Sequence, residues 1–238
     1  MKISIVIPAY NEEKCLPATL EKIGAALTTA GCDSEVIVVD NESTDETARI
    51  AESSGAKVFT EIEHNIARVR NTGAKNSSGD VLIFVDADTI VPEKLFQTIA
   101  NQMKDEEFFG GAVAVDYELF KRKWMKYYLL GWKFWGNPFN MKQCAAQFCR
   151  KSIFDEIHGY DETVYMGEDV MFYWRLSKFA KQKGGRLLFI ENPKVTTSAR
   201  RFDRMSVWKT LLLTHPLFIL LTSRKKRFWK DWYEKAVR

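Results

Sequence analysis

The chain has 238 residues, of which 46% are hydrophobic and 28% are charged, as is typical of a globular protein and not of a disordered one. Its formal net charge of +4 is too small to indicate a nucleic-acid partner, so none is expected. The four cysteines form no CxxC or Cys/His ligand pattern, and the N-terminus does not resemble a signal peptide. We therefore expect a cytoplasmic protein with reduced thiols.

Strands and helices alternate at the start of the chain. In order, the pattern predicts a strand, a helix, a strand, a helix and a strand, at residues 3–8, 11–30, 36–39, 46–53 and 57–59. The first strand is expected to end at Pro8. Such alternation indicates a parallel sheet with right-handed crossovers. Ligands of these sheets bind beyond the carboxyl ends of the strands, where this chain carries polar clusters.

The polar cluster after residues 81–85 contains two carboxylates. The five preceding residues are all apolar and predict a strand buried on both faces, which stops at Asp86 and Asp88. If strand geometry persists, both side chains project to the same side. Two like charges so close favour a divalent cation, which prefers oxygen ligands. A turn that follows a core strand is the alternative hypothesis.

The ends of the first two strands suggest a nucleotide site of an unusual kind. Neither a GxGxxG turn nor a Walker loop follows the first strand, which disfavours NAD and P-loop chemistry. A nucleotide would then be held by side chains and a metal. Tyr10 can stack on a base or ribose, and Asp40 can accept a hydrogen bond from a base N–H. Each residue alone is more often structural.

A helix is predicted over residues 64–75, beside the strand ends. From it Arg68 or Arg70 can reach an anionic ligand, although exposed arginines on helices usually face solvent. The nearby carboxylates favour a functional role for Arg70.

Together these motifs resemble those of family 2 glycosyltransferases with the GT-A fold. The residues that carry the resemblance are Pro8 to Glu13, Asp40 with Ser43, Asp45 and Thr47, Arg70-Asn71 with Gly73, Gly79-Asp80, and Asp86-Ala87-Asp88. The resemblance covers about residues 1 to 200. It implies an α/β fold with a mostly parallel, Rossmann-like sheet flanked by helices.

The resemblance also implies roles in donor binding. Pro8, Tyr10, Glu12 and Asp40 would hold the nucleotide, and Arg70 would assist at the base or phosphates. Asp88 would bind Mn²⁺ or Mg²⁺, with Asp86 near the ribose or the metal.

Acceptor-side motifs follow later in the chain. A helix predicted over 167–176 begins with Glu168 and Asp169, which are usually only capping residues. By resemblance, Asp169 is the catalytic base and Glu168 the second candidate. Arg200 or Arg201 would neutralise the leaving diphosphate. His158 stands where the family more often has glycine, which puts the shape of the acceptor loop in question.

Two segments are rich in aromatic and basic residues. Strands are expected near 110–115 and 187–190, and between them lies the segment 117–139, which either packs its aromatics inward or meets a membrane interface. It can also line the acceptor site. The tail at 205–230 has an apolar run too short to span a bilayer, followed by basic residues. An interfacial hairpin or helix is expected, with packing on the domain or self-association as the alternative. His215 is a weak candidate for a third metal ligand.

The sequence thus predicts an inverting, metal-dependent glycosyltransferase. A nucleotide-sugar-binding half at 1–115, an acceptor-binding half at 116–203 and an amphipathic basic tail at 204–238 are expected. The donor is a UDP- or GDP-sugar, and the acceptor a carbohydrate or lipid-linked hydroxyl. Location is cytoplasmic, with peripheral contact to the inner face of the membrane through 117–139 and 205–230. A nucleotidyltransferase and a non-catalytic nucleotide-binding membrane scaffold remain alternatives.

Overall fold

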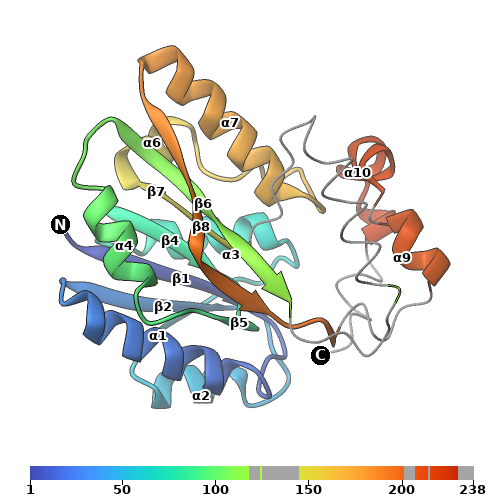
Figure 1. Ribbon diagram of the computed structural model, residues 1–238. Coiled ribbons are helices and arrows are strands. Elements are labelled where there is room, and N and C mark those ends of the chain that lie inside the picture. Colours follow the sequence, from blue (N-terminus) through green and yellow to red (C-terminus); the bar gives the residue numbers. More distant parts are fainter. Residues whose placement is uncertain (118–123, 125–144, 201–206, 214, 230–238) are drawn as a thin grey trace.

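A computed structural model describes residues 1–117, 124, 145–200, 207–213 and 215–229. Among these residues, eight strands form one sheet in the order β3-β2-β1-β4-β7-β6-β8-β5 (Figure 1). The strands are β1 (Ile3–Ala9), β2 (Ser34–Asp40), β3 (Lys57–Thr60), β4 (Val81–Val85), β5 (Thr89–Ile90), β6 (Phe108–Tyr117), β7 (Ala146–Arg150) and β8 (Arg186–Thr197). The helices are α1 (Leu16–Ala30), α2 (Thr47–Ser53), α3 (Ile66–Lys75), α4 (Leu95–Gln102), α6 (Lys151–Glu156), α7 (Glu168–Lys183), α9 (Val207–Leu213) and α10 (Pro216–Thr222).

The sheet is mostly parallel, as predicted. Strands β1 to β4 pair in parallel, and β6 pairs in parallel with β8. Strand β7 runs antiparallel between β4 and β6, and the short β5 runs antiparallel to β8. The carboxyl ends of β1, β2, β4, β6 and β8 therefore meet at one edge. Strands β5 and β7 were not predicted from the sequence.

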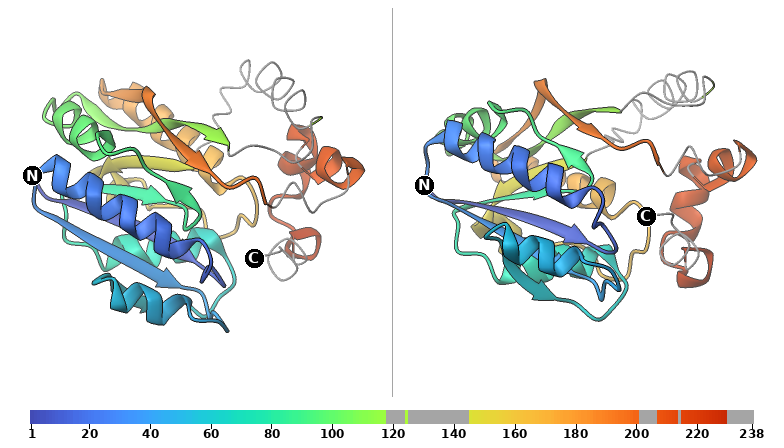
Figure 2. Two further views of the ribbon diagram at one scale, coloured as in Figure 1. Left: turned by 60° about the horizontal axis from the view of Figure 1, so that its bottom comes forward. Right: turned by 90° about the horizontal axis from the view of Figure 1, so that it is seen from below.

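Strand β4 lies inside the sheet and is buried on both faces, which confirms the prediction for 81–85. Its side chains alternate between two apolar clusters. Ile83 packs with residues of α1 and α4, whereas Leu82 and Phe84 pack with residues of α3, α6 and α7. Helices thus cover both faces of the sheet (Figures 1 and 2).

Several element boundaries differ from the predictions. Pro8 lies within β1, beyond the last pair with β4, so its missing N–H costs no bond to that strand. Helix α1 begins at Leu16 and not near Asn11, because Asn11 has a φ of +53°, outside the helical range. Helix α3 begins at Ile66, where the Asn65 side chain accepts hydrogen bonds from two backbone N–H groups. Strand β8 is longer than the predicted 187–190, and α4 was not predicted.

The described part of the tail forms two short helices that contact each other, α9 and α10. Figures 1 and 2 place both beyond the edge at which β1, β2 and β6 end. None of the helices in the described ranges has the length and apolar content needed to cross a membrane. Most of the segment 117–139 lies outside the described residues, so the prediction for it is untested.

Candidate active site

The loops that follow β1 and β2 are joined by hydrogen bonds. The Asn11 backbone N–H donates to Ser43 Oγ at 2.8 Å, and the Glu12 N–H donates to Thr47 Oγ1 at 2.7 Å. In return, the Thr44 N–H donates to Asn11 Oδ1 at 2.8 Å. The motif residues Ser43 and Thr47 therefore fasten the two strand ends together.

Asp40 ends β2 and keeps one carboxylate oxygen without a hydrogen bond. Only 6% of Asp40 is exposed; its Oδ2 accepts from the Ser43 N–H at 3.1 Å, but the buried Oδ1 has no hydrogen-bond partner among the described residues. An unpaired buried carboxylate oxygen is costly and indicates a missing donor. Nearby, the ring of Tyr10 meets that of His64 edge-on at 5.0 Å, and His64 Nδ1 is likewise buried and unpaired within the described chain. No role for His64 was predicted from the sequence.

Arg70 lies on α3, which packs unusually close to β1. A Cβ added to Gly73 would lie 2.3 Å from Val6 Cγ1, so this approach requires glycine. Arg70 is 5% exposed; its Nη2 donates to Asp86 Oδ1 at 2.8 Å and its Nη1 to Glu168 Oε1 at 2.6 Å. Both terminal nitrogens therefore hold protein carboxylates, where the resemblance had implied contact with the base or phosphates.

The charges around Arg70 are strongly coupled. Burial alone would lower the pKa of Arg70, but the carboxylates of Asp86 and Glu168 raise it well above its usual value. Partial burial raises the pKa of Asp86, the Arg70 charge opposes that rise, and the Asp88 carboxylate adds to it. Arg70 thus stabilises a group of acids that would otherwise repel one another.

Asp86 and Asp88 do not project to the same side of an extended strand. Strand β4 ends at Val85, and the Thr89 N–H donates to the Asp86 carbonyl at 3.0 Å, so the two acids lie in a turn. The expectation of continued strand geometry is wrong, because this hydrogen bond reverses the chain. Asp86 faces Arg70, whereas the hydrogen bonds that the Asp88 carboxylate accepts from described residues are long, from Thr197 Oγ1 at 3.3 Å and from Arg200 at 3.4 Å.

Arg200 contacts one acidic residue after β1 and one after β4. Besides Asp88, its guanidinium forms an ion pair with Glu12, which is 7% exposed. The two predicted donor-binding residues Glu12 and Arg200 therefore bind each other. Arg201 lies outside the described residues.

Glu168 and Asp169 form the first turn of α7, after Gly167 in the left-handed region at φ +74°. Burial and then the charge of Glu168 raise the pKa of Asp169 to about 7, against the opposing charge of Arg70. A carboxylate with a pKa near neutrality is suited to general-base catalysis.

A polar residue inside β7 fixes the start of α7. Gln147 is buried; its side-chain amide donates to the Asp169 carbonyl at 2.9 Å and accepts from the Tyr160 hydroxyl at 3.0 Å. The Arg70 guanidinium lies 5.3 Å from the centroid of the Tyr160 ring. No role for Gln147 was predicted, because nothing in its sequence neighbourhood signals the contact with α7.

The loop between α6 and α7 begins with two residues in left-handed conformation. His158 has a φ of +59° and Gly159 a φ of +58°. This region favours glycine, which agrees with the glycine that the resemblance led us to expect at position 158.

A metal would have to be held by few protein ligands. In the described ranges, no three His, Cys, Asp or Glu side chains lie close enough together to hold an ion. His215 is exposed at the start of α10, and its role as a third ligand stays a prediction. The Asp88 carboxylate still fits a cation, because it is partly exposed and only weakly bound. Mg²⁺ commonly binds one or two carboxylates together with substrate phosphates.

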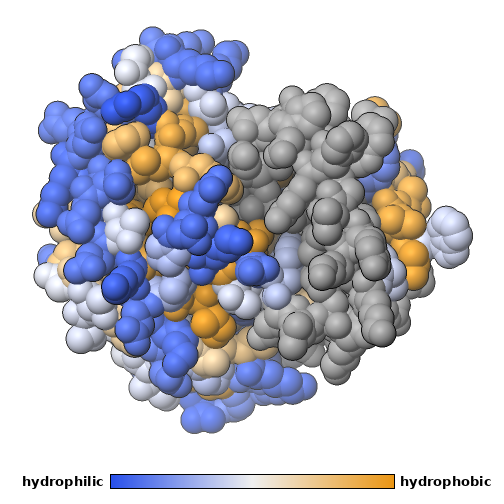
Figure 3. Space-filling model, viewed as in Figure 1, coloured by the Kyte–Doolittle hydropathy of each residue, from blue (hydrophilic) through white to orange (hydrophobic). Residues whose placement is uncertain are grey.

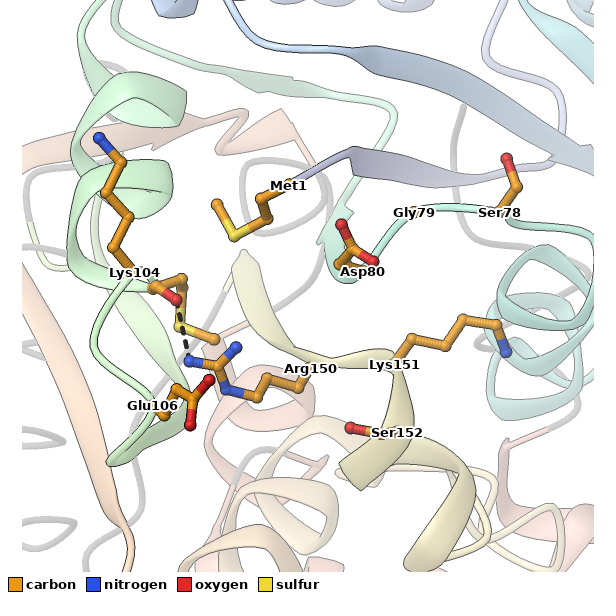
Figure 4. A pocket seen from close by; sticks show the side chains of 10 residues that line it. Met1, Ser78, Gly79, Asp80, Lys104, Glu106, Arg150, Lys151 and Ser152 are labelled. Atoms are coloured by element: carbon orange, nitrogen blue, oxygen red, sulfur yellow. Dashed lines mark hydrogen bonds between the residues drawn. The ribbon is translucent and has the colours of Figure 1, made fainter.

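A separate hollow of about 720 Å³ opens at the other end of the sheet (Figure 4). Its lining includes Asp80 before β4, Arg150 at the end of β7 and Lys151 at the start of α6. The Arg150 guanidinium donates hydrogen bonds there to the carbonyls of Met103, Asp105 and Phe108. This hollow lies opposite the polar strand ends and is not part of the candidate site.

A family model described as "Glycosyl transferase family 2" matches residues 4–158. The chain belongs to this family. The match includes the motif residues from Pro8 to Asp88 and the strand β7. The GT-A fold expected for a family 2 glycosyltransferase is confirmed by the mixed sheet flanked by helices.

Curated relatives of this family 2 chain are similar over part of their length. The uncharacterized glycosyltransferase YfnE of Bacillus subtilis is 40% identical over 114 residues, which are 45% of this chain and 27% of YfnE. An undecaprenyl-phosphate 4-deoxy-4-formamido-L-arabinose transferase of Klebsiella pneumoniae is 34% identical over 120 residues, which are 46% of this chain and 36% of that protein. The aligned segments thus span about a third of these relatives.

A solved structure shares the fold. The glucosyl-3-phosphoglycerate synthase of Mycobacterium tuberculosis, in complex with Mn²⁺, UDP and glucosyl-3-phosphoglycerate, has a TM-score of 0.64 to this family 2 chain. The superposition covers 94% of this chain and 79% of the other, at 18% sequence identity. At that identity the likeness shows the fold alone.

Proposed function

We propose that the chain transfers a sugar from a nucleotide-diphosphate donor to an acceptor hydroxyl, with inversion at the anomeric carbon. The observation that carries the proposal is the contact of Arg70 with both Asp86 and Glu168. It joins the turn with two carboxylates to the helix start that presents Asp169. A base with a pKa near neutrality therefore lies in the same charged cluster as a candidate site for phosphates and metal.

The donor half is proposed to comprise residues 1–115. The unpaired Oδ1 of Asp40 would accept a hydrogen bond from a base N–H, and the Tyr10 ring would pack against the nucleoside. Pro8, in β1, would help shape this pocket through its fixed backbone. UDP in the complex of the mycobacterial synthase supports a nucleotide of this kind.

Asp88, with Asp86 beside it, would hold Mn²⁺ or Mg²⁺ together with the diphosphate. When bound, the cation would offset the negative charge of the leaving diphosphate. The mycobacterial synthase, whose complex contains Mn²⁺, supports this proposal. Arg200, which pairs with Glu12, would add a positive charge beside Asp88 and the phosphates.

Asp169 would be the catalytic base, in an acceptor half at 116–203. Its carboxylate would take the proton of the acceptor hydroxyl while that oxygen bonds to the anomeric carbon. The bond from the same carbon to the donor diphosphate breaks on the opposite side, so the configuration inverts. No covalent enzyme intermediate is required. Arg70 and Gln147 would position this base and would not touch substrate.

The acceptor is proposed to be a carbohydrate or lipid-linked hydroxyl. The Klebsiella relative is named for an undecaprenyl-phosphate substrate, which supports a lipid-linked acceptor. A peripheral position on a membrane would bring the catalytic edge of the sheet to such a substrate.

A donor screen tests this function. Purified chain would be incubated with UDP- and GDP-sugars and Mn²⁺, with and without lipid extract, and free nucleotide would be measured. A glycosyltransferase releases UDP or GDP, and the Asp169→Asn variant should not. A nucleotidyltransferase would instead release pyrophosphate from nucleoside triphosphates. The absence of release from any donor would favour a non-catalytic scaffold.

A further inference from the structure

The tail exposes large apolar side chains to solvent. Trp208 is 82% exposed, Leu212 55% and Leu221 75%, and Val207, Leu211 and Phe228 are partly exposed as well. Figure 3 shows apolar side chains at the right-hand edge, where α9 lies in Figure 1. Such groupings on a globular surface mark an interaction site.

The tail nevertheless has aromatic packing of its own. Trp229 is fully buried, and its indole N–H donates to the Thr222 carbonyl at 2.9 Å. The Phe218 ring packs edge-on against the rings of both Trp229 and Phe228. The segment thus buries some aromatic residues and leaves Trp208 and Leu221 exposed.

Four consecutive basic residues, 224–227, are exposed directly after α10. Arg224 pairs with Asp161, but Lys225 and Lys226 form no ion pair with any side chain in the described part of the chain. Exposed Trp and Leu in the same short tail as cations that have no ion pair among the described residues match the chemistry of an anionic lipid surface, where rings lie at headgroup depth and cations meet phosphates. A second copy of the chain fits less well, because a twofold interface would bring the same cations together.

The tail is attached to the acceptor loop at three points. The Tyr165 N–H donates to the Ser223 carbonyl at 2.7 Å, and Arg224 donates to the Asp161 carboxylate at 2.9 Å. A Cβ added to Gly167 would lie 3.1 Å from Ile219 Cγ2, so α10 also contacts the residue before α7. The apolar surface is therefore fixed next to the helix start that carries Asp169.

We propose that the surface formed by α9, α10 and residues 224–228 docks on an anionic lipid bilayer. Docking there would turn the catalytic edge of the sheet toward the membrane, because the tail lies beyond the carboxyl ends of the strands (Figures 1 and 2). A lipid-borne acceptor would then reach Asp169 from the bilayer surface. This last step rests on the proposed function, whereas the docking itself does not.

Vesicle co-sedimentation of the full chain tests the docking without any sugar donor. The probes are vesicles of phosphatidylcholine alone and of phosphatidylcholine with phosphatidylglycerol. Binding is expected only to the anionic vesicles. The double variant Lys225→Glu/Lys226→Glu should bind them roughly tenfold or more weakly, since each basic residue near an anionic surface contributes appreciably. Trp208→Ser/Leu221→Ser should weaken binding as well.

Matched controls separate the surface from general charge or hydrophobicity. Lys22→Glu/Lys104→Glu changes the net charge equally, on α1 and after α4, and Ile62→Ser removes an apolar side chain that is 69% exposed on the loop after β3. Both controls should bind vesicles like the parent chain. Circular dichroism would show that every variant is folded.

Three outcomes would overturn the proposal: equal binding to neutral and anionic vesicles, no binding at all, or equal losses in the tail variants and their controls. Sedimentation velocity without lipid adds a fourth. If Trp208→Ser/Leu221→Ser converts a dimer to a monomer there, the surface joins two copies of the chain. Docking with no release of nucleotide from any donor would overturn the proposed function and leave the docking intact.

Discussion

Arg70 Nη1 lies 2.6 Å from Glu168 Oε1, and this contact joins residues that are 98 positions apart in the sequence. It connects the half of the chain that carries the candidate donor site to the helix that carries Asp169. Both side chains are buried, so the pair acts in a medium where charge interactions are strong. The contact therefore ties the turn after β4 to the start of α7, in addition to the sheet that β4 and β7 share.

Loss of Arg70 should destabilise the fold. Arg70→Met leaves Glu168 and Asp86 without their shared cation, and the free energy of unfolding should fall by about 3 kcal/mol. Urea denaturation measures this change. Arg49→Met is the matched control, because the exposed Arg49 pairs with Glu46 on the surface and should contribute less than about 1 kcal/mol.

A double-variant cycle then separates the pair from other effects. Arg70→Met/Glu168→Gln should be less destabilised than the sum of the two single changes, since it removes the unpaired charge of Glu168. Simple additivity would mean that the two residues do not interact in solution as they do in the structure.

Asp169→Asn should fold and bind donor but lose transfer. The change keeps the shape of the side chain and removes its ability to accept a proton, so kcat should fall by about 10²-fold to 10⁴-fold. Nucleotide release measures kcat, and calorimetry measures donor binding. Asp155→Asn, on the exposed face of α6, is the control. Full activity of Asp169→Asn would exclude this residue as the base.

Activity should depend on pH near neutrality. The folded-state pKa of Asp169 is raised to about 7, so the carboxyl group is protonated below that pH and cannot accept a proton. We expect kcat to drop about tenfold per pH unit on the acid side and to level off above pH 7. Donor affinity, measured over the same range, should not follow this curve. A kcat that stays constant through this range would contradict the assignment.

Asp88→Ala should abolish metal-dependent donor binding. The variant removes the Asp88 carboxylate, whose hydrogen bonds to described residues are long and weak. Mn²⁺ should therefore no longer increase donor affinity. Calorimetry with and without Mn²⁺ measures the difference. Asp116→Ala, an exposed position on β6, is the control. An unchanged effect of Mn²⁺ in Asp88→Ala would place the metal elsewhere.

Glu35 should make the fold sensitive to acid. Burial alone would raise its pKa, but hydrogen bonds from Lys57, Ser4 and Ser78 lower it to about 2. The stabilisation is therefore present above the unfolded-state pKa and is lost as pH falls toward 2. Glu35→Gln should cost about 2 kcal/mol at neutral pH and much less near pH 3. Denaturant unfolding at both pH values tests this, with the exposed Glu21→Gln as control.

The core strands could be predicted because their sequence pattern is local. The apolar runs at 36–39 and 81–85 had to be buried on both faces, and the structure places both inside the sheet. Strand β7 was not predicted, because its residues 146–150 mix apolar and polar types and because it is antiparallel to both of its neighbours. Short elements such as β5 depend on pairing with a distant segment, which no local pattern encodes.

The sequence by itself determined the family, the mostly parallel sheet and the positions of the acidic motifs at its carboxyl edge. It could do so because hydrophobic periodicity and motif order are properties of neighbouring residues. The tertiary structure alone decided which acid meets which base: Arg70 with Asp86 and Glu168, and Arg200 with Glu12 and Asp88. These contacts join residues that are far apart in the chain, and folding brings them together where burial makes the pairing of charges obligatory.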